Sequence, residues 1–113
     1  MAHEKRFILF EYYIPIPVLR AKHSTLHVFQ LTLHELKSMI RSWGGKARVV
    51  SCTFHPTIDR AISQALEVEL ERCSESYMYD PSDTIVVIVP RKRVDEVKSP
   101  DDLEAYLVTV ETT

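Results

Sequence analysis

A histidine stands between a predicted strand and a predicted helix in the middle of the chain. The stretch 49–70, VVSCTFHPTIDRAISQALEVEL, begins with apolar residues typical of a strand, and an amphipathic pattern follows His55 and Pro56. The free N–H groups and the dipole at the first turn of a helix favour bound anions, phosphate above all. An imidazole placed there can protonate a leaving oxygen of a phosphodiester. The alternative interpretation is that His55 caps the helix or packs against it.

A second group of residues suited to phosphate chemistry follows the most apolar segment of the chain. The segment 84–97, TIVVIVPRKRVDEV, predicts a buried strand that ends at its proline. Three cations and a carboxylate come directly afterwards: Arg91, Lys92, Arg93 and Glu96. A guanidinium binds phosphate oxygens through a planar fork of donors, and a carboxylate accepts a proton or positions a neighbouring group. The alternative interpretation of these charges is a solvated turn.

The composition limits the kinds of protein that this chain can be. Its 113 residues and 45% hydrophobic content fit one domain with one core, over 1–113. The net charge of −2 and the pI of about 6.2 argue against a protein that coats nucleic acid, so DNA is an unlikely partner and any polyanion site must be local. No apolar run approaches the roughly 18 residues of a membrane span, and the amino end lacks the pattern of a secretory signal. We therefore expect a cytoplasmic protein with no membrane partner.

Strand and helix patterns alternate along the chain. Strands are predicted over 7–13, around 26–30, over 47–53, at the start of 68–72, over 85–89 and over 106–110. Two main helices are predicted, one starting after Thr32 and one starting at Pro56, and a short capped helix is predicted at Ser99. The expected fold class is α/β, a single domain with a mixed β-sheet of about five strands flanked by two main helices.

The first predicted helix has clear signals at both ends. Thr32 and Glu35 have the spacing of a capping box, and Gly44 with Gly45 supplies the stop typical of a left-handed cap. The apolar residues of this helix recur at helical spacing and predict a face packed on the core: Leu33, Leu36, Met39, Ile40 and Trp43. The chain between the first two strands, 18–24, is predicted to be a loop.

Several other chemistries lack the residues that they require. His23 and His27 lie four apart, but in a predicted loop and strand where they share no helical face, and the two glycines are adjacent, which excludes a phosphate-binding glycine loop. We therefore expect no metal and no cofactor. Cys52 and Cys73 are expected to be buried free thiols, and a disulfide between them is the alternative for a protein of a hyperthermophile.

The two segments of interest together resemble a known family. The residues that carry the resemblance are His55, Thr57, Ala61, Ser63 and Leu66, followed by an Arg-x-x-Glu spacing at Arg93 and Glu96. This pattern is similar to that of the small ring nucleases that archaeal viruses and some phages carry as type III anti-CRISPR proteins. Those proteins degrade cyclic tetra-adenylate, a second messenger of the host. The resemblance runs over about 31–110.

The resemblance implies roles for named residues. His55 corresponds to the catalytic histidine, Arg93 to the phosphate-binding arginine and Glu96 to the active-site carboxylate. Further ligand contacts are implied for Thr57, Arg91, Lys92, Glu11 and Tyr12. The chain departs from the family where Phe54 replaces a glycine before the histidine, and where Glu11 and Tyr12 replace an Asn-Ala pair at the end of the first strand. A carboxylate at Glu11 repels phosphate, which bears on the identity of the ligand.

The resemblance also implies a mechanism and a setting. A 2′-hydroxyl attacks the neighbouring phosphorus without a metal, His55 protonates the departing 5′-oxygen, and the linear product ends in a 2′,3′-cyclic phosphate. A ring with repeated symmetry fits a two-fold pair of subunits, so a homodimer in the cytoplasm of an infected host cell is expected. The alternatives are a viral regulatory protein that binds a nucleotide or DNA without cleaving it, and a purely structural protein.

Overall fold

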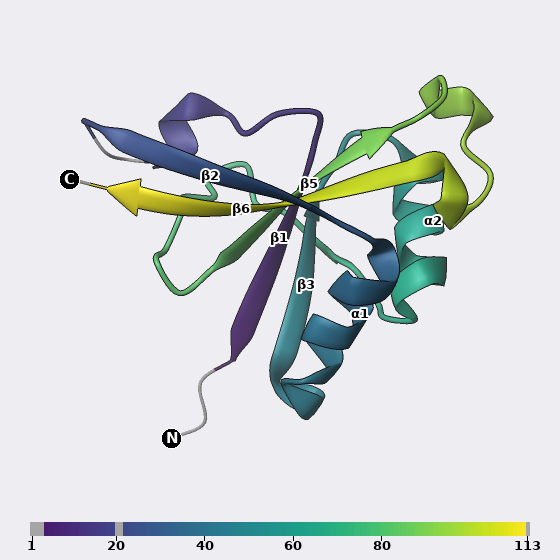
Figure 1. Ribbon diagram of the computed structural model, residues 1–113, viewed down its shortest axis with the longest axis horizontal. Coiled ribbons are helices and arrows are strands. Elements are labelled where there is room, and N and C mark those ends of the chain that lie inside the picture. Colours follow the sequence, from purple (N-terminus) through teal and green to yellow (C-terminus); the bar gives the residue numbers. More distant parts are fainter. Residues whose placement is uncertain (1–3, 20–21, 113) are drawn as a thin grey trace.

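Strand β1 (Lys5–Glu11) lies inside a six-stranded sheet of the order β2-β6-β5-β1-β3-β4 in the computed structural model, which describes residues 4–19 and 22–112 (Figure 1). The other strands are β2 (Ser24–Leu31), β3 (Ala47–Cys52), β4 (Glu71–Arg72), β5 (Thr84–Pro90) and β6 (Leu103–Thr112). Strand β1 runs parallel to both β3 and β5, whereas β6 is antiparallel to β5 and to β2. The predicted mixed α/β sheet is confirmed; its six strands slightly exceed the expected number of about five, and the strand predicted at 68–72 is reduced to the two-residue β4, which pairs with β3.

Both helices pack on one face of this sheet. Helices α1 (Leu33–Arg41) and α2 (Pro56–Leu66) lie beside each other in Figure 1 and share a core cluster with alternate residues of the strands. The largest fully buried members of that cluster are Phe7, Leu9, Leu36, Ile58, Ile62, Leu66 and Ile88. Alternate side chains of a strand point to opposite faces, which is why β1 supplies Phe7 and Leu9 to this side.

The opposite face of the sheet carries no α-helix among the described residues. Ile8, Phe10, Ile85 and Val87 form a second cluster there. The short helical turn η1 (Ile16–Leu19) and the connection over 73–83 contribute partly buried side chains that cover this cluster, Val18 and Tyr77 among them. The turn η1 and the 73–83 connection therefore cover part of this face, and the rest of it is exposed to solvent.

A buried carboxylate fastens the 73–83 connection to β1. Asp83 is 6% exposed and receives two hydrogen bonds from the Arg6 guanidinium, of 2.9 and 2.8 Å, and one of 2.7 Å from the Tyr77 hydroxyl. Burial of the phenol, together with the Asp83 hydrogen bond, raises the pKa of Tyr77 above its ordinary value. The phenol therefore stays neutral and acts as a donor.

Two details of the predicted first helix change in the structure. The capping box of Thr32 and Glu35 is present, but α1 ends at Arg41, before the glycines. Gly44 does adopt a positive φ of 61°, within the turn η2 (Gly44–Lys46) that leads into β3. Trp43 consequently falls outside the helical repeat and is 43% exposed, with the Lys5 ammonium 5.6 Å from its ring centroid. Its predicted place on the core face is wrong.

The cysteines are paired rather than free. Cys52 at the end of β3 and Cys73 just after β4 form a disulfide, so the expectation of free thiols is wrong and the pairing named as the alternative is present. The bridge is local in space because β3 and β4 are parallel neighbours, and the Cys73 N–H donates to the Ser51 carbonyl. Of the predicted loop 18–24, residues 20–21 lie outside the described part of the chain.

The topology gathers the ends of the parallel strands at one edge. Strands β1, β3 and β5 run in the same direction, so the residues that follow Glu11, Cys52 and Pro90 emerge at the same edge of the sheet. In open α/β sheets this carboxyl edge is where ligands bind. In the part of the chain that the structure describes, none of the helices combines the length and the apolar character that crossing a membrane requires.

Candidate functional site

His55 and Glu11 meet at the carboxyl edge of β1 and β3. Phe10 of β1 pairs with Cys52 of β3, so the residues just beyond each strand are neighbours. His55 is the N-cap residue of α2, with extended backbone (φ −123°, ψ 126°), but its side chain makes no capping hydrogen bond. Its Nδ1 instead lies 2.7 Å from Oε2 of Glu11. The simple helix-capping alternative for His55 therefore does not describe its side chain.

The two side chains differ sharply in their exposure. The Glu11 side chain is 1% exposed and the His55 side chain is 43% exposed. The other oxygen of Glu11, Oε1, accepts the backbone N–H of Phe54 at 3.1 Å. Because the Glu11 carboxylate accepts a hydrogen bond from Nδ1, the Nε2 atom of the imidazole is the nitrogen available to a ligand at the carboxyl edge of the sheet. Glu11 thus lies behind His55 as its orienting partner.

Sequence reasoning missed a second carboxylate that fixes the same junction. Asp59, in the first turns of α2, accepts through Oδ1 the hydroxyl protons of Ser51, at 2.5 Å, and of Thr53, at 2.6 Å. Its Oδ2 lies 2.7 Å from the Arg72 guanidinium, which also donates to the Thr53 carbonyl. Ser51 and Thr53 are 1% exposed. Polar residues at alternate positions of an apolar strand, followed by an acid, were the available signal.

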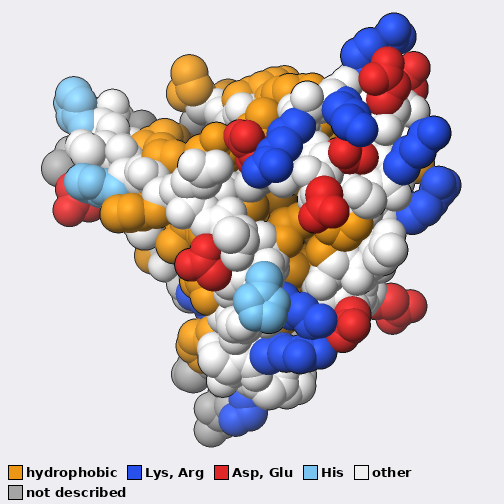
Figure 2. Space-filling model, turned by 45° about the vertical axis from the view of Figure 1, so that its right-hand side comes forward, with side chains coloured by type: hydrophobic (Ala, Val, Ile, Leu, Met, Phe, Trp, Pro, Cys, Tyr) orange, Lys and Arg blue, Asp and Glu red, His pale blue; other side chains and the backbone are white. Residues whose placement is uncertain are grey.

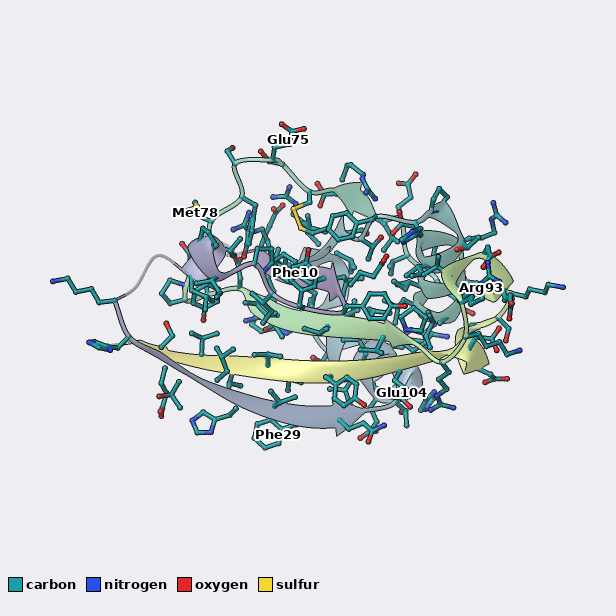
Figure 3. All side chains as sticks on the ribbon, turned by 90° about the horizontal axis from the view of Figure 1, so that it is seen from above. Phe10, Phe29, Glu75, Met78, Arg93 and Glu104 are labelled. Carbon is teal, nitrogen blue, oxygen red and sulfur yellow. A yellow bond between two sulfur atoms is a disulfide. The ribbon has the colours of Figure 1, made fainter. Side chains whose placement is uncertain are left out.

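Thr57 connects this junction to the segment that carries the cations. Its hydroxyl donates to the Val94 carbonyl at 2.6 Å, which brings the turn η3 (Val94–Glu96) to the first turn of α2. Arg93 precedes that turn and is highly exposed, with its guanidinium 3.4 Å from Asp95. Figure 3 places Arg93 on the connection at the outer end of the molecule. Among the described hydrogen bonds, none joins Arg93 or Glu96 to His55.

The other two predicted cations have acidic partners. Arg91 Nε lies 3.3 Å from Glu104 Oε1, and Lys92 Nζ lies 3.2 Å from Asp102 Oδ1. Arg91 also lines a cavity of about 630 Å³ together with residues of α1, including His34. Figure 2 shows Lys and Arg side chains interspersed with Asp and Glu side chains along the upper right of the molecule. Arg91 therefore lines a cavity whose lining includes neither Glu11 nor His55.

Tyr12 marks the end of β1. It has a left-handed backbone conformation (φ 68°), and its N–H donates to the Ile88 carbonyl at 3.0 Å. Half of the Tyr12 side chain is exposed, and it borders a shallow groove with Leu26 and Val28 of β2. Tyr12 therefore lies beside Glu11 in sequence and presents its ring to the helix-free face of the sheet.

Asp102 is the anchor of the connection between β5 and β6. Hydrogen bonds from the Lys98 N–H, the Lys92 ammonium and the Ser99 N–H hold the pKa of this carboxyl below its ordinary value. The turn η4 (Pro100–Asp102) begins with the predicted cap at Ser99, whose capping box with Asp102 is present. Asp102 thereby ties down the chain that carries Lys92.

Comparison with known proteins supports the fold. No protein-family model matches the chain, and no curated protein matches it in sequence. Among solved structures, B116 of Sulfolobus turreted icosahedral virus is similar, with a TM-score of 0.64 and 16% sequence identity. The match covers 90% of this chain and 97% of that protein. At this identity the likeness shows that the chain shares the fold of a viral protein over nearly its whole length.

Proposed function

We propose that the protein is a metal-independent ring nuclease that opens cyclic tetra-adenylate into linear products ending in a 2′,3′-cyclic phosphate. The observation that carries the proposal is the pairing of exposed His55 with buried Glu11 at the N-terminus of α2, on the carboxyl edge of the parallel strands. A proton donor held by a buried carboxylate beside an anion-favouring helix end suits phosphodiester cleavage.

The chemistry needs two proton transfers. The 2′-oxygen forms a bond to the adjacent phosphorus while the bond from phosphorus to the 5′-oxygen breaks. Doubly protonated His55 gives its Nε2 proton to the departing 5′-oxygen, and the Glu11 carboxylate balances the charge of the imidazolium. Glu96, on the turn that Thr57 ties to α2, is assigned to accept the proton of the 2′-hydroxyl.

Arg93 is assigned to the phosphoryl oxygens. Its ion pair with Asp95 is at the surface, and such pairs contribute between about 0 and 1 kcal/mol. Exchanging Asp95 for a phosphate therefore costs little. The hydrogen bond from Thr57 to Val94 sets the position of the Arg93 turn relative to the start of α2.

The sequence resemblance and the fold support the proposed setting. A viral protein of the same fold supports a viral origin, in which the enzyme removes a host messenger of type III CRISPR immunity in the host cytoplasm. A symmetric ring is best bound by two copies, each supplying one His55, so the active form is proposed to be a homodimer. Light scattering after gel filtration measures this, and a strictly monomeric protein that still cleaves the ring would contradict the dimer.

The decisive experiment is an incubation of labelled cyclic tetra-adenylate with the protein in EDTA, followed by separation of the products. The variants are His55→Ala and, as a matched control, His34→Ala, which changes an exposed histidine on α1. We expect cleavage by the wild type and by His34→Ala, and a loss of roughly 10²- to 10⁴-fold in His55→Ala. A ring that is bound but stays intact would support the non-catalytic alternative, and no binding of nucleotide or DNA would overturn both.

A further inference from the structure

An apolar pocket of about 360 Å³ adjoins the pair of Glu11 and His55. It opens on the helix-free face of the sheet, between the chain that follows β1 and the connection that follows β4. Glu11 and Phe54 line it, and both also belong to the His55 site through the hydrogen bond between them. Figure 3 shows Glu75 and Met78 on the connection above Phe10, which marks the position of the pocket.

The walls of the pocket are aromatic and are held together covalently. Tyr13 and Phe54 are 60% and 63% exposed, so a ligand in the pocket can reach them. The disulfide of Cys52 and Cys73 also lines the pocket and joins the strand before Phe54 to the connection that forms the opposite wall. The bridge therefore holds the connection after β4 against the end of β3, next to Phe54.

The charges of the lining exclude an anion. The residues that line the pocket are all among those that the structure describes, and they include no Lys, Arg or His, whereas Glu11 and Glu75 contribute two carboxylates. A phosphate there would meet the negative charge of these two carboxylates without any cationic side chain to offset it, since the other polar side chains of the lining are neutral hydroxyls. A neutral planar ring would stack on the aromatic side chains and remain close to His55.

We propose that this pocket binds the nucleobase of a nucleotide whose phosphodiester lies at His55. The inference rests on the proposed function and extends it, because it divides the ligand between two environments. The base occupies the apolar, aromatic pocket lined by Tyr13, Phe54 and Met78, while the phosphate faces His55 and Arg93. This division explains how a buried carboxylate at Glu11 is compatible with a phosphate-containing ligand.

The test uses Phe54→Ala and Tyr13→Ala, with Phe29→Ala as a matched control. Phe29 is 55% exposed on the edge strand β2, which Figure 3 shows far from the pocket. Nuclear magnetic resonance titrations measure the binding of adenosine 5′-monophosphate and of ribose 5-phosphate, and cleavage assays give KM and kcat for cyclic tetra-adenylate. We expect the two pocket variants to weaken adenosine monophosphate by about 5- to 100-fold, with ribose 5-phosphate unchanged and KM raised more than kcat is lowered.

The outcomes separate this inference from the proposed function. Unchanged adenosine monophosphate binding in both pocket variants, with cleavage intact in the wild type, overturns the base pocket and leaves the ring nuclease in place. If the wild type cleaves nothing but the pocket variants lose base-dependent binding, the base pocket stands and the nuclease fails. Equal losses for both ligands would show a general disturbance of the fold and would overturn the base assignment, and circular dichroism of Phe54→Ala checks the fold directly.

Discussion

Nδ1 of His55 lies 2.7 Å from Oε2 of Glu11, although 44 positions separate the two residues in sequence. The contact exists because β1 and β3 are parallel neighbours whose carboxyl ends coincide. It turns Glu11, a residue first assigned to the ligand, into the partner that sets the orientation of the imidazole. The pairing leaves Nε2 as the nitrogen available for proton transfer.

Replacing Glu11 by Gln removes the negative charge at nearly constant volume. We expect kcat for cyclic tetra-adenylate to fall by about 10²-fold, within the roughly 10²- to 10⁴-fold that a general acid contributes, with a smaller change in KM. Steady-state kinetics measure both parameters. Glu69→Gln is the matched control, because Glu69 is exposed between α2 and β4 and has no hydrogen bond to His55 among the described contacts. Full kcat in Glu11→Gln would contradict the orienting role.

Replacing Asp59 by Ala leaves two buried hydroxyls, those of Ser51 and Thr53, without their carboxylate acceptor. A buried polar group left unsatisfied costs about 1–3 kcal/mol, so we expect the free energy of unfolding to fall by about that amount. Urea denaturation measures it. Asp59→Asn keeps one acceptor oxygen and should lose less, and equal losses in the two variants would show that acceptance of these protons is not the cause.

Short-range sequence signals were sufficient to predict the helices and strands. The candidate site could not be predicted in full, because it depends on contacts between residues far apart in the sequence. The capping box of Thr32 and Glu35 and the proline at the start of α2 act within one turn of chain, so sequence was sufficient. The pairing of Glu11 with His55 depends on which strands are neighbours in the sheet, and local sequence patterns do not determine the strand order. The helical spacing of apolar residues wrongly predicted that Trp43 packs in the core, because α1 ends two residues earlier, at Arg41.

The same limit applies to the charged residues. Arg91, Lys92 and Arg93 were correctly placed after a buried strand, but their partners Glu104, Asp102 and Asp95 were not foreseen. Glu104 becomes a neighbour of Arg91 because β6 returns antiparallel beside β5. The sequence pattern was sufficient to predict the strands. Only the fold shows that each of the three cations has an acidic partner.

Substitutions of Arg93 and of its ion-pair partner Asp95 should change the affinity for cyclic tetra-adenylate in opposite directions. Replacing Asp95 by Asn frees the guanidinium, so we expect tighter binding of cyclic tetra-adenylate by up to about 5-fold, the range of a surface pair. Replacing Arg93 by Ala should weaken binding and reduce its dependence on salt. Isothermal titration calorimetry in the His55→Ala background measures binding without cleavage. Looser binding in Asp95→Asn would remove Arg93 from the ligand site.

The disulfide of Cys52 and Cys73 closes a loop with a sequence separation of 21. A cross-link over a loop of that length stabilises a fold by about 3 kcal/mol, mainly by restricting the unfolded chain. We expect the double variant Cys52→Ser with Cys73→Ser to melt roughly 10 °C lower than the wild type. Differential scanning calorimetry with and without a dithiol reductant measures this. The double variant should not respond to the reductant, and an unchanged wild-type melting temperature under reduction would contradict the stabilising role.

Asp102 should make stability depend on acid pH. Its carboxylate accepts the N–H groups of Lys98 and Ser99 and lies 3.2 Å from the Lys92 ammonium, and these contacts lower its pKa in the folded state. A carboxyl whose folded pKa lies below its unfolded value stabilises the fold above the ordinary carboxyl range near pH 4, and this contribution is lost as pH falls through the lowered pKa. The melting temperature of Asp102→Ala should therefore lie below that of the wild type at pH 7, and the difference between the two melting temperatures should narrow steadily below about pH 4.

The matched control is Asp101→Ala, which changes the exposed neighbouring acid and should follow the wild type at every pH. A gap that stays constant down to pH 2 would mean that Asp102 acts through packing rather than through its charge.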